Sequence, residues 1–289
     1  MKLIRFGNLD KEKPGVCINN INYDVSHLVK DYNEDFFAEG GLAQLQKLIE
    51  KNGSQLKEIP AGERLGPPVA RPSKIICIGL NYKDHALEMN VAPPPEPVIF
   101  MKATTSLCGA FDEVIIPRDS VKTDWEVELA VVIGKKASYV TAATAMDYVA
   151  GYCLHNDVSE REFQLERGGT WDKGKGCDTF APLGPYLVTK DEIADVNNLK
   201  MWLKVNGTEM QQGTTANLIF DVPFLIMYVS KFMTLLPGDI ISTGTPAGVG
   251  LGFKPPVFLK KGDTMELSIE GLGTGKQTCI AYDPLTHAI

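Results

Sequence analysis

Three acidic residues stand in two neighbouring strand-like stretches of the sequence. Residues 123–134 read T-D-W-E-V-E-L-A-V-V-I-G, and at the two-residue period of a strand Glu126 and Glu128 share one face of an otherwise apolar segment. A second strand-like stretch, residues 151–157, ends in Asp157. Buried carboxylates cost free energy unless a cation or water meets them, and oxygen ligands without a thiol pattern suit Mg²⁺ or Mn²⁺ better than zinc. The pattern predicts a divalent-metal site, although the same spacing also fits an edge strand whose glutamates face solvent.

A histidine and a glutamate form a second candidate constellation. The stretch N-Y-K-D-H-A-L-E-M-N, residues 81–90, reads as a short helix on which His85 and Glu88 lie three positions apart on one face. A carboxylate beside an imidazole orients the ring as a general base requires. Gly79 precedes this helix and the run V-A-P-P-P-E-P follows it, so we expect a tethered segment that acts as a lid. The alternative is a solvated surface pair.

Further polar candidates lie in glycine-rich stretches. Lys175 stands in the expected loop W-D-K-G-K-G-C-D-T-F-A-P-L-G-P, where it either pairs with a substrate carboxylate or is an exposed turn lysine. Thr245 stands in T-G-T-P-A-G-V-G, a loop whose backbone N–H groups and hydroxyls suit a carboxylate but which lacks the ending of a P-loop. Arg161 and Gln164 lie three apart on another expected helix.

Composition narrows the class of protein. The chain has 289 residues and a net charge of −7, so nucleic acid and anionic membranes are not expected partners. It holds no apolar run of the length that a membrane helix needs, and its N-terminal stretch does not read as a signal peptide. Its six cysteines are scattered without a C-x-x-C pair. We therefore expect free thiols in a reducing cytoplasm.

The chain divides at the proline-rich stretch 66–73, G-P-P-V-A-R-P-S. We expect a small N-terminal α/β domain over residues 1–70 and a larger domain over 71–289. Periodicity and turn signals predict strands at 2–6, 15–18, 74–78, 97–102, 113–117, 123–134, 151–157, 199–205 and 240–242, with a last hairpin at 264–281. Helices are predicted at 41–51, 81–90, 142–150, 158–167 and 221–233. The many short strands indicate a β-rich α+β fold.

Six stretches together resemble the fumarylacetoacetate hydrolase family, in the family's order, over about residues 74–275. They are I-G-L-N-Y-K-D-H-A-L-E-M, P-V-I-F-M-K, D-W-E-V-E-L-A-V-V-I-G, H-N-D-V-S-E-R, G-K-G-C-D-T-F-A-P-L-G-P and T-G-T-P-A-G-V-G. The resemblance implies a β-sandwich roll as the catalytic domain, with its site in a mouth of the roll, in a homodimer that takes a small-molecule keto-acid substrate. The N-terminal unit resembles the small domain that many members carry.

The resemblance also implies roles for individual residues. The metal ligands, for Mg²⁺ or Mn²⁺, are Glu126, Glu128 and Asp157. The catalytic residues are His85, Glu88 and Lys175, and the positions matching substrate-side residues are Arg161, Gln164, Thr245 and Lys102. One position departs from the family pattern, because acylpyruvase-like members often have an arginine where this chain has Leu80. The loss of a bidentate guanidinium disfavours simple acylpyruvates and oxaloacetate, and it brings the chain nearer to the branch with sugar-derived diketo-acid hydrolases.

The implied reaction is hydrolysis of a carbon–carbon bond in a 2,4-diketo acid, with the pyruvate enolate that leaves held by the metal. The same residues also suit keto–enol tautomerisation of oxaloacetate, decarboxylation, or an activity of the ureidoglycolate lyase type. From a different class, a non-catalytic carboxylate-binding protein remains open, although such a protein has no need of the His85–Glu88 base.

Overall fold

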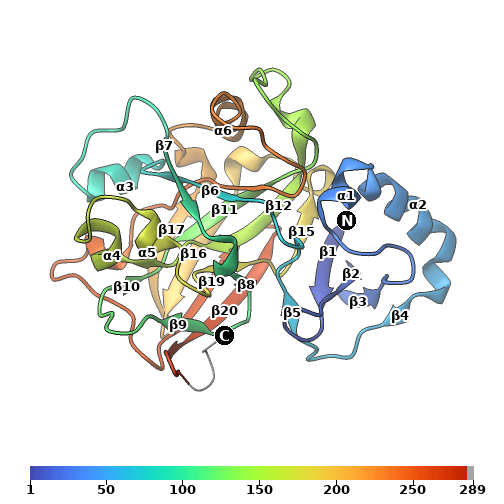
Figure 1. Cartoon of the computed structure of the whole chain (residues 1–289), viewed down its shortest axis with the longest axis horizontal. Helices are drawn as coiled ribbons and strands as arrows, with labels where there is room; N and C mark the ends of the chain where they lie inside the picture. Colours follow the sequence, from blue (N-terminus) through green and yellow to red (C-terminus); the bar gives the residue numbers. More distant parts are fainter. Residues whose placement is uncertain (285–289) are drawn as a thin grey trace.

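The computed structural model describes residues 1–284 (Figure 1). Residues 285–289, the end of the predicted larger domain, lie outside the described range. Its N-terminal part contains two helices, α1 (Glu34–Ala38) and α2 (Gly41–Asn52), and five strands: β1 (Lys2–Phe6), β2 (Lys13–Ile18), β3 (Ile21–Asp24), β4 (Lys57–Glu58) and β5 (Leu65–Gly66). None of the helices within residues 1–284 is long and apolar enough to cross a membrane.

The rest of the described chain is richer in strands than in helices. Its helices are α3 (Lys83–Glu88), α4 (Arg161–Leu165), α5 (Asp172–Lys175) and α6 (Val222–Val229). Its strands are β6 (Ile75–Gly79), β7 (Val98–Lys102), β8 (Leu107–Gly109), β9 (Val114–Ile116), β10 (Thr123–Asp124), β11 (Val127–Ile133), β12 (Val149–Asn156), β13 (Ser159–Glu160), β14 (Ala181–Leu183), β15 (Leu187–Thr189), β16 (Lys200–Val205), β17 (Thr208–Thr214), β18 (Ile240–Ser242), β19 (Thr264–Ile269) and β20 (Gly273–Ala281).

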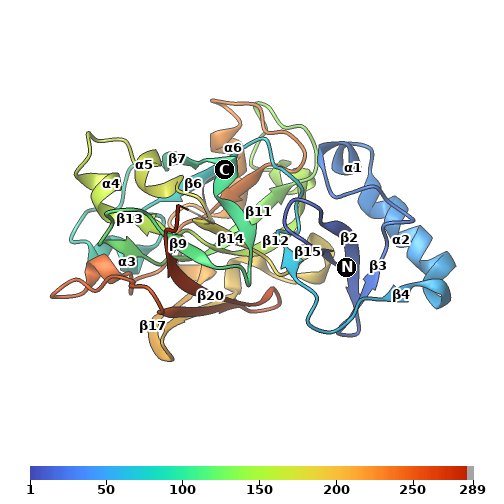
Figure 2. The same cartoon turned by 60° about the horizontal axis from the view of Figure 1, so that its bottom comes forward.

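Two large sheets form the body of the molecule. The first follows the order β4-β3-β2-β1-β15-β12-β11-β18-β6-β7, with β5, β8 and β14 pairing beside this path, and the second follows β17-β16-β19-β20-β9 (Figure 2). Apolar side chains from β11 and β12 pack against side chains from β16 and β19 in one buried cluster. The β-rich α+β sandwich predicted from the sequence is confirmed.

Strand β11 is buried along its whole length, and its two faces enter different cores. Val127, Leu129 and Val131 belong to the cluster between the two sheets. Ala130 and Val132 belong to a second cluster on the opposite face of the large sheet. The alternation read from the sequence is therefore confirmed, and Glu126 and Glu128 follow the second face.

The N-terminal part is joined to the larger part through the first sheet. Strand β1 pairs antiparallel with β15 at Lys2–Val188 and Leu3–Leu187. The second cluster contains side chains from both parts of the chain, among them Leu3, Leu45 and Cys153. In both views the N-terminal part extends to one side, away from α3, α4 and α5 (Figures 1 and 2). The division near residue 70 stays a prediction.

Local predictions were wrong in two segments. The helix expected at 142–150 is only a 3-10 turn over Ala145–Tyr148, because Val149 already pairs with Ile133 as the start of β12. The stretch expected as an open loop around Lys175 instead forms the short helix α5, which packs beside α4. Gly174 permits that packing, since a Cβ there would lie 2.4 Å from the carbonyl oxygen of Glu160.

Candidate active site

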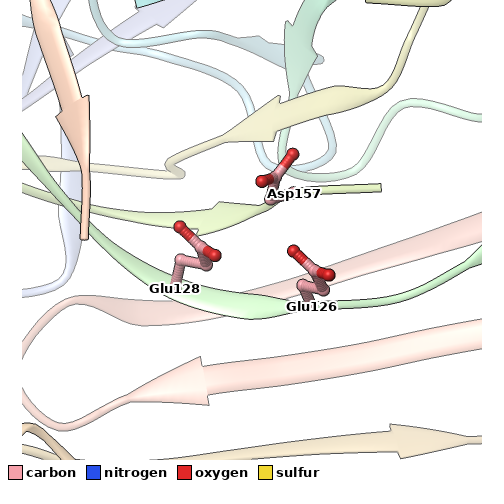
Figure 3. A group of neighbouring side chains, drawn as sticks. All are labelled: Glu126, Glu128 and Asp157. Atoms are coloured by element: carbon pink, nitrogen blue, oxygen red, sulfur yellow. The ribbon is translucent and has the colours of Figure 1, made fainter. Parts of the chain in front are cut away.

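The three carboxylates converge where β11 begins and β12 ends (Figure 3). Antiparallel pairing places Asp157 beside Glu126, whose carbonyl accepts a hydrogen bond from the Asp157 N–H at 2.9 Å. One oxygen from each of Glu126, Glu128 and Asp157 lies within 4.8 Å of the others. The residues are 5%, 2% and 0% exposed, so the alternative of a solvent-facing edge strand is wrong.

Three cations neutralise this acidic cluster from neighbouring elements. Lys102, at the end of β7, lies 2.5 Å from Asp157. Lys175, on α5, bridges Glu126 at 2.7 Å and Asp157 at 2.9 Å. Arg161, at the start of α4, lies 2.7 Å from Glu126. Burial acts to raise the pKa of Asp157, but the two lysines outweigh it and hold that pKa below its usual range. The cluster is thus a dense, buried ion network.

Glu128 differs from its two neighbours because its carboxylate meets neutral donors. The Ser242 hydroxyl donates to Oε2 at 2.6 Å and the Gly244 N–H at 3.0 Å. Burial raises the pKa of Glu128 well above its usual value, and the charges of Asp157 and Glu126 raise it further. A cation shared by the three carboxylates would favour ionised Glu128, and each carboxylate oxygen has a second lone pair for it. The oxygen-only set therefore fits a hard divalent ion such as Mg²⁺ or Mn²⁺.

A buried histidine stands behind Glu128. His155 lies opposite Glu128 on β12, and its Nδ1 is 2.6 Å from the Ser242 hydroxyl. When Glu128 is ionised, as a bound cation would favour, the Ser242 hydroxyl donates to it and Nδ1 donates to that hydroxyl. His155 Nε2 is then a buried lone pair without a hydrogen-bond partner. Burial lowers the pKa of His155 to about 3, so the ring is neutral. The sequence analysis missed this His155–Ser242–Glu128 chain, although strand alternation already places His155 and Asp157 on one face.

The predicted base dyad is assembled on α3. His85 Nδ1 lies 3.0 Å from Glu88 Oε2, and the other carboxylate oxygen of Glu88 accepts the Gly248 N–H at 2.8 Å. Gly252 allows this approach, because a Cβ there would lie 2.5 Å from the Glu88 carboxylate. With Glu88 ionised, Nδ1 carries the proton and Nε2 is available as a base. The dyad is largely buried rather than a solvated surface pair.

Of the residues that the family resemblance matches to substrate binding, some line the cavity and one does not. Thr245 lines the cavity, but its hydroxyl donates to the Val127 carbonyl at 2.9 Å. Only a lone pair of that hydroxyl is left to meet a substrate, since it also accepts from Gln211. Gln164 lines the cavity and accepts a hydrogen bond from Arg161 at 3.0 Å.

Lys102 lies outside the lining and contacts the site through Asp157 and the Val158 carbonyl. Its geometry supports a role in holding Asp157 rather than in touching substrate.

Asp124 connects the walls of the site, a role that sequence analysis also missed. Its carboxylate accepts hydrogen bonds from Arg161 Nε at 2.8 Å and from the N–H groups of Gly250 and Leu251 at 2.7 and 3.0 Å. This fully buried aspartate thereby ties α4 to the loop that holds the dyad. The signal was present in the sequence, since T-D-W-E-V-E contains a third carboxylate two positions before Glu126.

A cavity of about 150 Å³ joins the dyad to the carboxylates. Its polar lining consists of His85, Glu126, Glu128, Arg161, Gln164, Lys175 and Thr245. Its apolar lining comes from Ile78, Leu80, Met89, Val91, Phe100, Leu165, Trp171, Val249 and Leu251, together with Gly79. Leu80 has a φ of 54°, a left-handed conformation that costs a residue with a Cβ about 1 kcal/mol. Such strain at a cavity wall is typical of functional positions.

Comparison with known proteins matches residues 74–280 to the family model described as fumarylacetoacetate (FAA) hydrolase C-terminal. One relative is a protein of Burkholderia cenocepacia (strain HI2424) that is provisionally named as a hydrolase. It is 52% identical over 276 residues, covering 94% of this chain and 96% of that protein. This match covers more of the chain than residues 74–280 and includes much of the N-terminal region.

Three solved structures are similar over nearly their whole length. Fumarylacetoacetate hydrolase from Exiguobacterium antarcticum is 35% identical with a TM-score of 0.84, covering 98% of this chain and 100% of that chain. Maleylpyruvate hydrolase from Sphingobium sp. SYK-6, solved with a manganese(II) ion and pyruvate, is 31% identical with a TM-score of 0.82 and the same coverage. The 2-hydroxyhepta-2,4-diene-1,7-dioate isomerase from Mycobacterium marinum is 32% identical with a TM-score of 0.76, covering 97% and 98%.

Proposed function

This chain belongs to the fumarylacetoacetate hydrolase family, and we propose that it is a divalent-metal-dependent hydrolase that cleaves a carbon–carbon bond of a 2,4-diketo acid. One observation carries the proposal: His85 of the dyad and two carboxylates of the cluster, Glu126 and Glu128, line one cavity. Glu88 holds His85 from behind, and Asp157 completes the cluster. A base at one end and an anionic, cation-binding floor at the other are the two parts that hydrolysis of an acylpyruvate needs.

The dyad supplies the base. Glu88 holds His85 through Nδ1, so Nε2 takes a proton from a water molecule in the cavity. The oxygen of that water attacks the distal carbonyl carbon, C4, and the bond between C3 and C4 breaks. C3 takes up a proton to give pyruvate, and C4 leaves as the carboxylic acid. Glu88 keeps its orientation through the Gly248 N–H during these steps.

The floor binds the α-keto acid end. Glu126, Glu128 and Asp157 would hold a divalent ion, which would supply Lewis-acid stabilisation of the negative charge that develops as the bond breaks. Lys175, whose ammonium reaches Glu126 and Asp157, holds these carboxylates and presents a cation to the substrate carboxylate. Mg²⁺ and Mn²⁺ both suit the oxygen ligands, and the manganese(II) ion in the Sphingobium structure supports a divalent cation as the cofactor.

The test is release of pyruvate from acylpyruvates, 2,4-diketo-3-deoxy sugar acids and oxaloacetate in Mg²⁺, Mn²⁺ or EDTA. We expect metal-dependent release from at least one diketo acid, and loss of that release in His85→Ala. The matched control is Leu87→Ala, since Leu87 lies on the same helix but is 80% exposed and outside the cavity. Turnover that is indifferent to metal, or equal in both variants, contradicts the proposal. Binding of a diketo acid with no turnover in either the wild-type protein or His85→Ala would instead favour a non-catalytic carboxylate-binding protein.

A second candidate is isomerisation, favoured by the similarity to the Mycobacterium marinum isomerase. Proton transfer by His85 without attack by water gives a keto–enol or double-bond shift with the same residues. Ketonisation of enol oxaloacetate, followed by ultraviolet absorbance in a sample that cleaves no diketo acid, would select this reaction. The homodimer stays a prediction, which light scattering tests.

A further inference from the structure

The polar and apolar residues of the cavity are separated by depth. The lining residues Glu126, Glu128, Lys175 and Thr245 are at most 5% exposed, and they form the floor together with the fully buried Asp157 that contacts Lys175. Partly or largely exposed apolar residues surround the mouth; we call them the apolar rim, and they are Leu80, Met89, Val91, Leu165, Trp171 and Leu251. A substrate whose keto acid end lies on the floor therefore extends its distal half past this rim.

Specific packing contacts hold the residues of the apolar rim in place. The indole of Trp171 packs on Phe100, with ring centroids 5.3 Å apart. Gly79 makes room for it, because a Cβ there would lie 2.4 Å from the Trp171 ring. Leu80 reaches the cavity from a backbone with a φ of 54°. Three elements of the chain are thus arranged so that apolar carbon faces the mouth.

The described lining has no free cation for a charged distal group. Its only cationic side chains are Arg161 and Lys175, and both are engaged by carboxylates of the chain at 2.7–2.9 Å. A distal carboxylate would lose water at the rim without gaining a free cationic partner. Distal hydroxyls would find few hydrogen-bonding side chains, namely the Trp171 indole and the Gln164 amide. An alkyl group pays no such penalty and gains from burial against the rim.

We propose that this enzyme selects 2,4-diketo acids whose distal acyl group is uncharged and apolar, a short alkyl chain. This rests on the proposed function for the floor and the dyad. It reverses the expectation drawn from Leu80, which disfavoured simple acylpyruvates and favoured a sugar-derived substrate, since a polyhydroxylated distal half has few partners at such a rim.

The experiment compares three acids of matched length with the metal-loaded enzyme. They are 2,4-dioxooctanoate, its analogue 2,4-dioxooctanedioate with a terminal carboxylate, and a 5,6-dihydroxy analogue. We expect kcat/KM for the octanoate to exceed both others by at least about tenfold. Equal or better turnover of either polar acid overturns the inference and leaves the proposed hydrolase intact.

A binding measurement separates the two proposals if no acid is cleaved. Calorimetric dissociation constants of the same three acids for His85→Ala, with metal present, rank the distal groups without turnover. If the octanoate binds most tightly, the preference of the rim for apolar groups is supported even though no acid is hydrolysed. Tighter binding of the diacid or the dihydroxy acid overturns the inference.

Leu80→Arg tests the rim directly by adding a cation to it. We expect the diacid-to-octanoate ratio of kcat/KM to rise at least about tenfold, because the new guanidinium pairs with the distal carboxylate. Leu87→Arg is the matched control, with the same change of side chain on the exposed face of α3. The ratio is taken within each variant, so partial loss of folded protein cancels. An equal shift in both variants means that the rim does not touch the distal group, and overturns the inference.

Discussion

The two ends of the candidate site are formed by different structural elements. The charged floor is part of the central sheet and its flanking helices, with every carboxylate engaged by buried partners. The base dyad sits on α3, six residues long, and is joined to the neighbouring loop by the bond from Gly248 to Glu88. We infer that the floor determines stability and ion binding, whereas the dyad determines the rate of turnover. Variants at the two ends should therefore change different measured quantities.

The largest effect is expected at Asp157. Asp157→Asn keeps the shape of the side chain but leaves the buried ammonium groups of Lys102 and Lys175 short of a charge partner. The free energy of unfolding should fall by about 3–5 kcal/mol, measured by urea denaturation in EDTA. Glu162→Gln, which breaks the exposed pair with Arg167, is the control and should cost less than about 1 kcal/mol. Equal losses would mean that the floor is no more structural than the surface.

His85→Ala should affect turnover rather than stability. Removing the base should lower kcat by about 10²–10⁴-fold with a diketo acid, while the dissociation constant for Mn²⁺ and the urea midpoint stay near the wild-type values. Steady-state kinetics, calorimetry and urea denaturation on the same preparation measure these three quantities. A loss of ion affinity as large as the loss of turnover would erase the distinction between the two ends.

Ion binding should stabilise the floor without any substrate. Mn²⁺ at about 100 times its dissociation constant should raise the free energy of unfolding by about 2.7 kcal/mol, measured as a shift of the urea midpoint. Glu128→Gln removes one ligand charge and should abolish most of the shift, whereas Glu88→Gln should retain it. A full shift in Glu128→Gln contradicts the assignment of the ligands.

The smallest effect is expected from a single added methyl group at Gly252. In Gly252→Ala the new Cβ would lie 2.5 Å from the Glu88 carboxylate, so that side chain must move away from His85 or Gly248. We expect kcat to fall by about tenfold with little change in stability, because the displaced group is the end of a side chain. Gly53→Ala, where a Cβ meets no atom within 4 Å, is the control. Unchanged kcat would show that Glu88 does not need its present position.

Local periodicity was enough to predict the faces that carry the chemistry. Strand alternation placed Glu126 and Glu128 together, and the spacing of three on a helix placed His85 beside Glu88. These relations depend only on neighbours in sequence. The helix predicted at 142–150 failed for the converse reason, since pairing of β12 with β11 takes Val149 into a strand.

The counter-charges could not be predicted in the same way. Lys102 meets Asp157 across 55 residues and Ser242 meets Glu128 across 114, through strand order that no single stretch encodes. Lys175 was singled out from its glycine-rich surroundings, but as a substrate lysine. Its bridge between two floor carboxylates became visible only once α5 was packed beside α4.

The parallel pairing of β6 with β18 also governs when the site can come into existence during synthesis. Ile75 pairs with Ile240, and the adjoining contact of Lys74 with Asp239 spans 165 residues. At about 5–20 residues per second, a ribosome takes roughly 8–33 s to make that span. Throughout this interval the edge of β6 that later meets β18 is uncovered, and Glu128 lacks its Ser242 donor. The nascent chain therefore passes through a period in which β6 has an open edge that can pair with other chains, before the floor is complete.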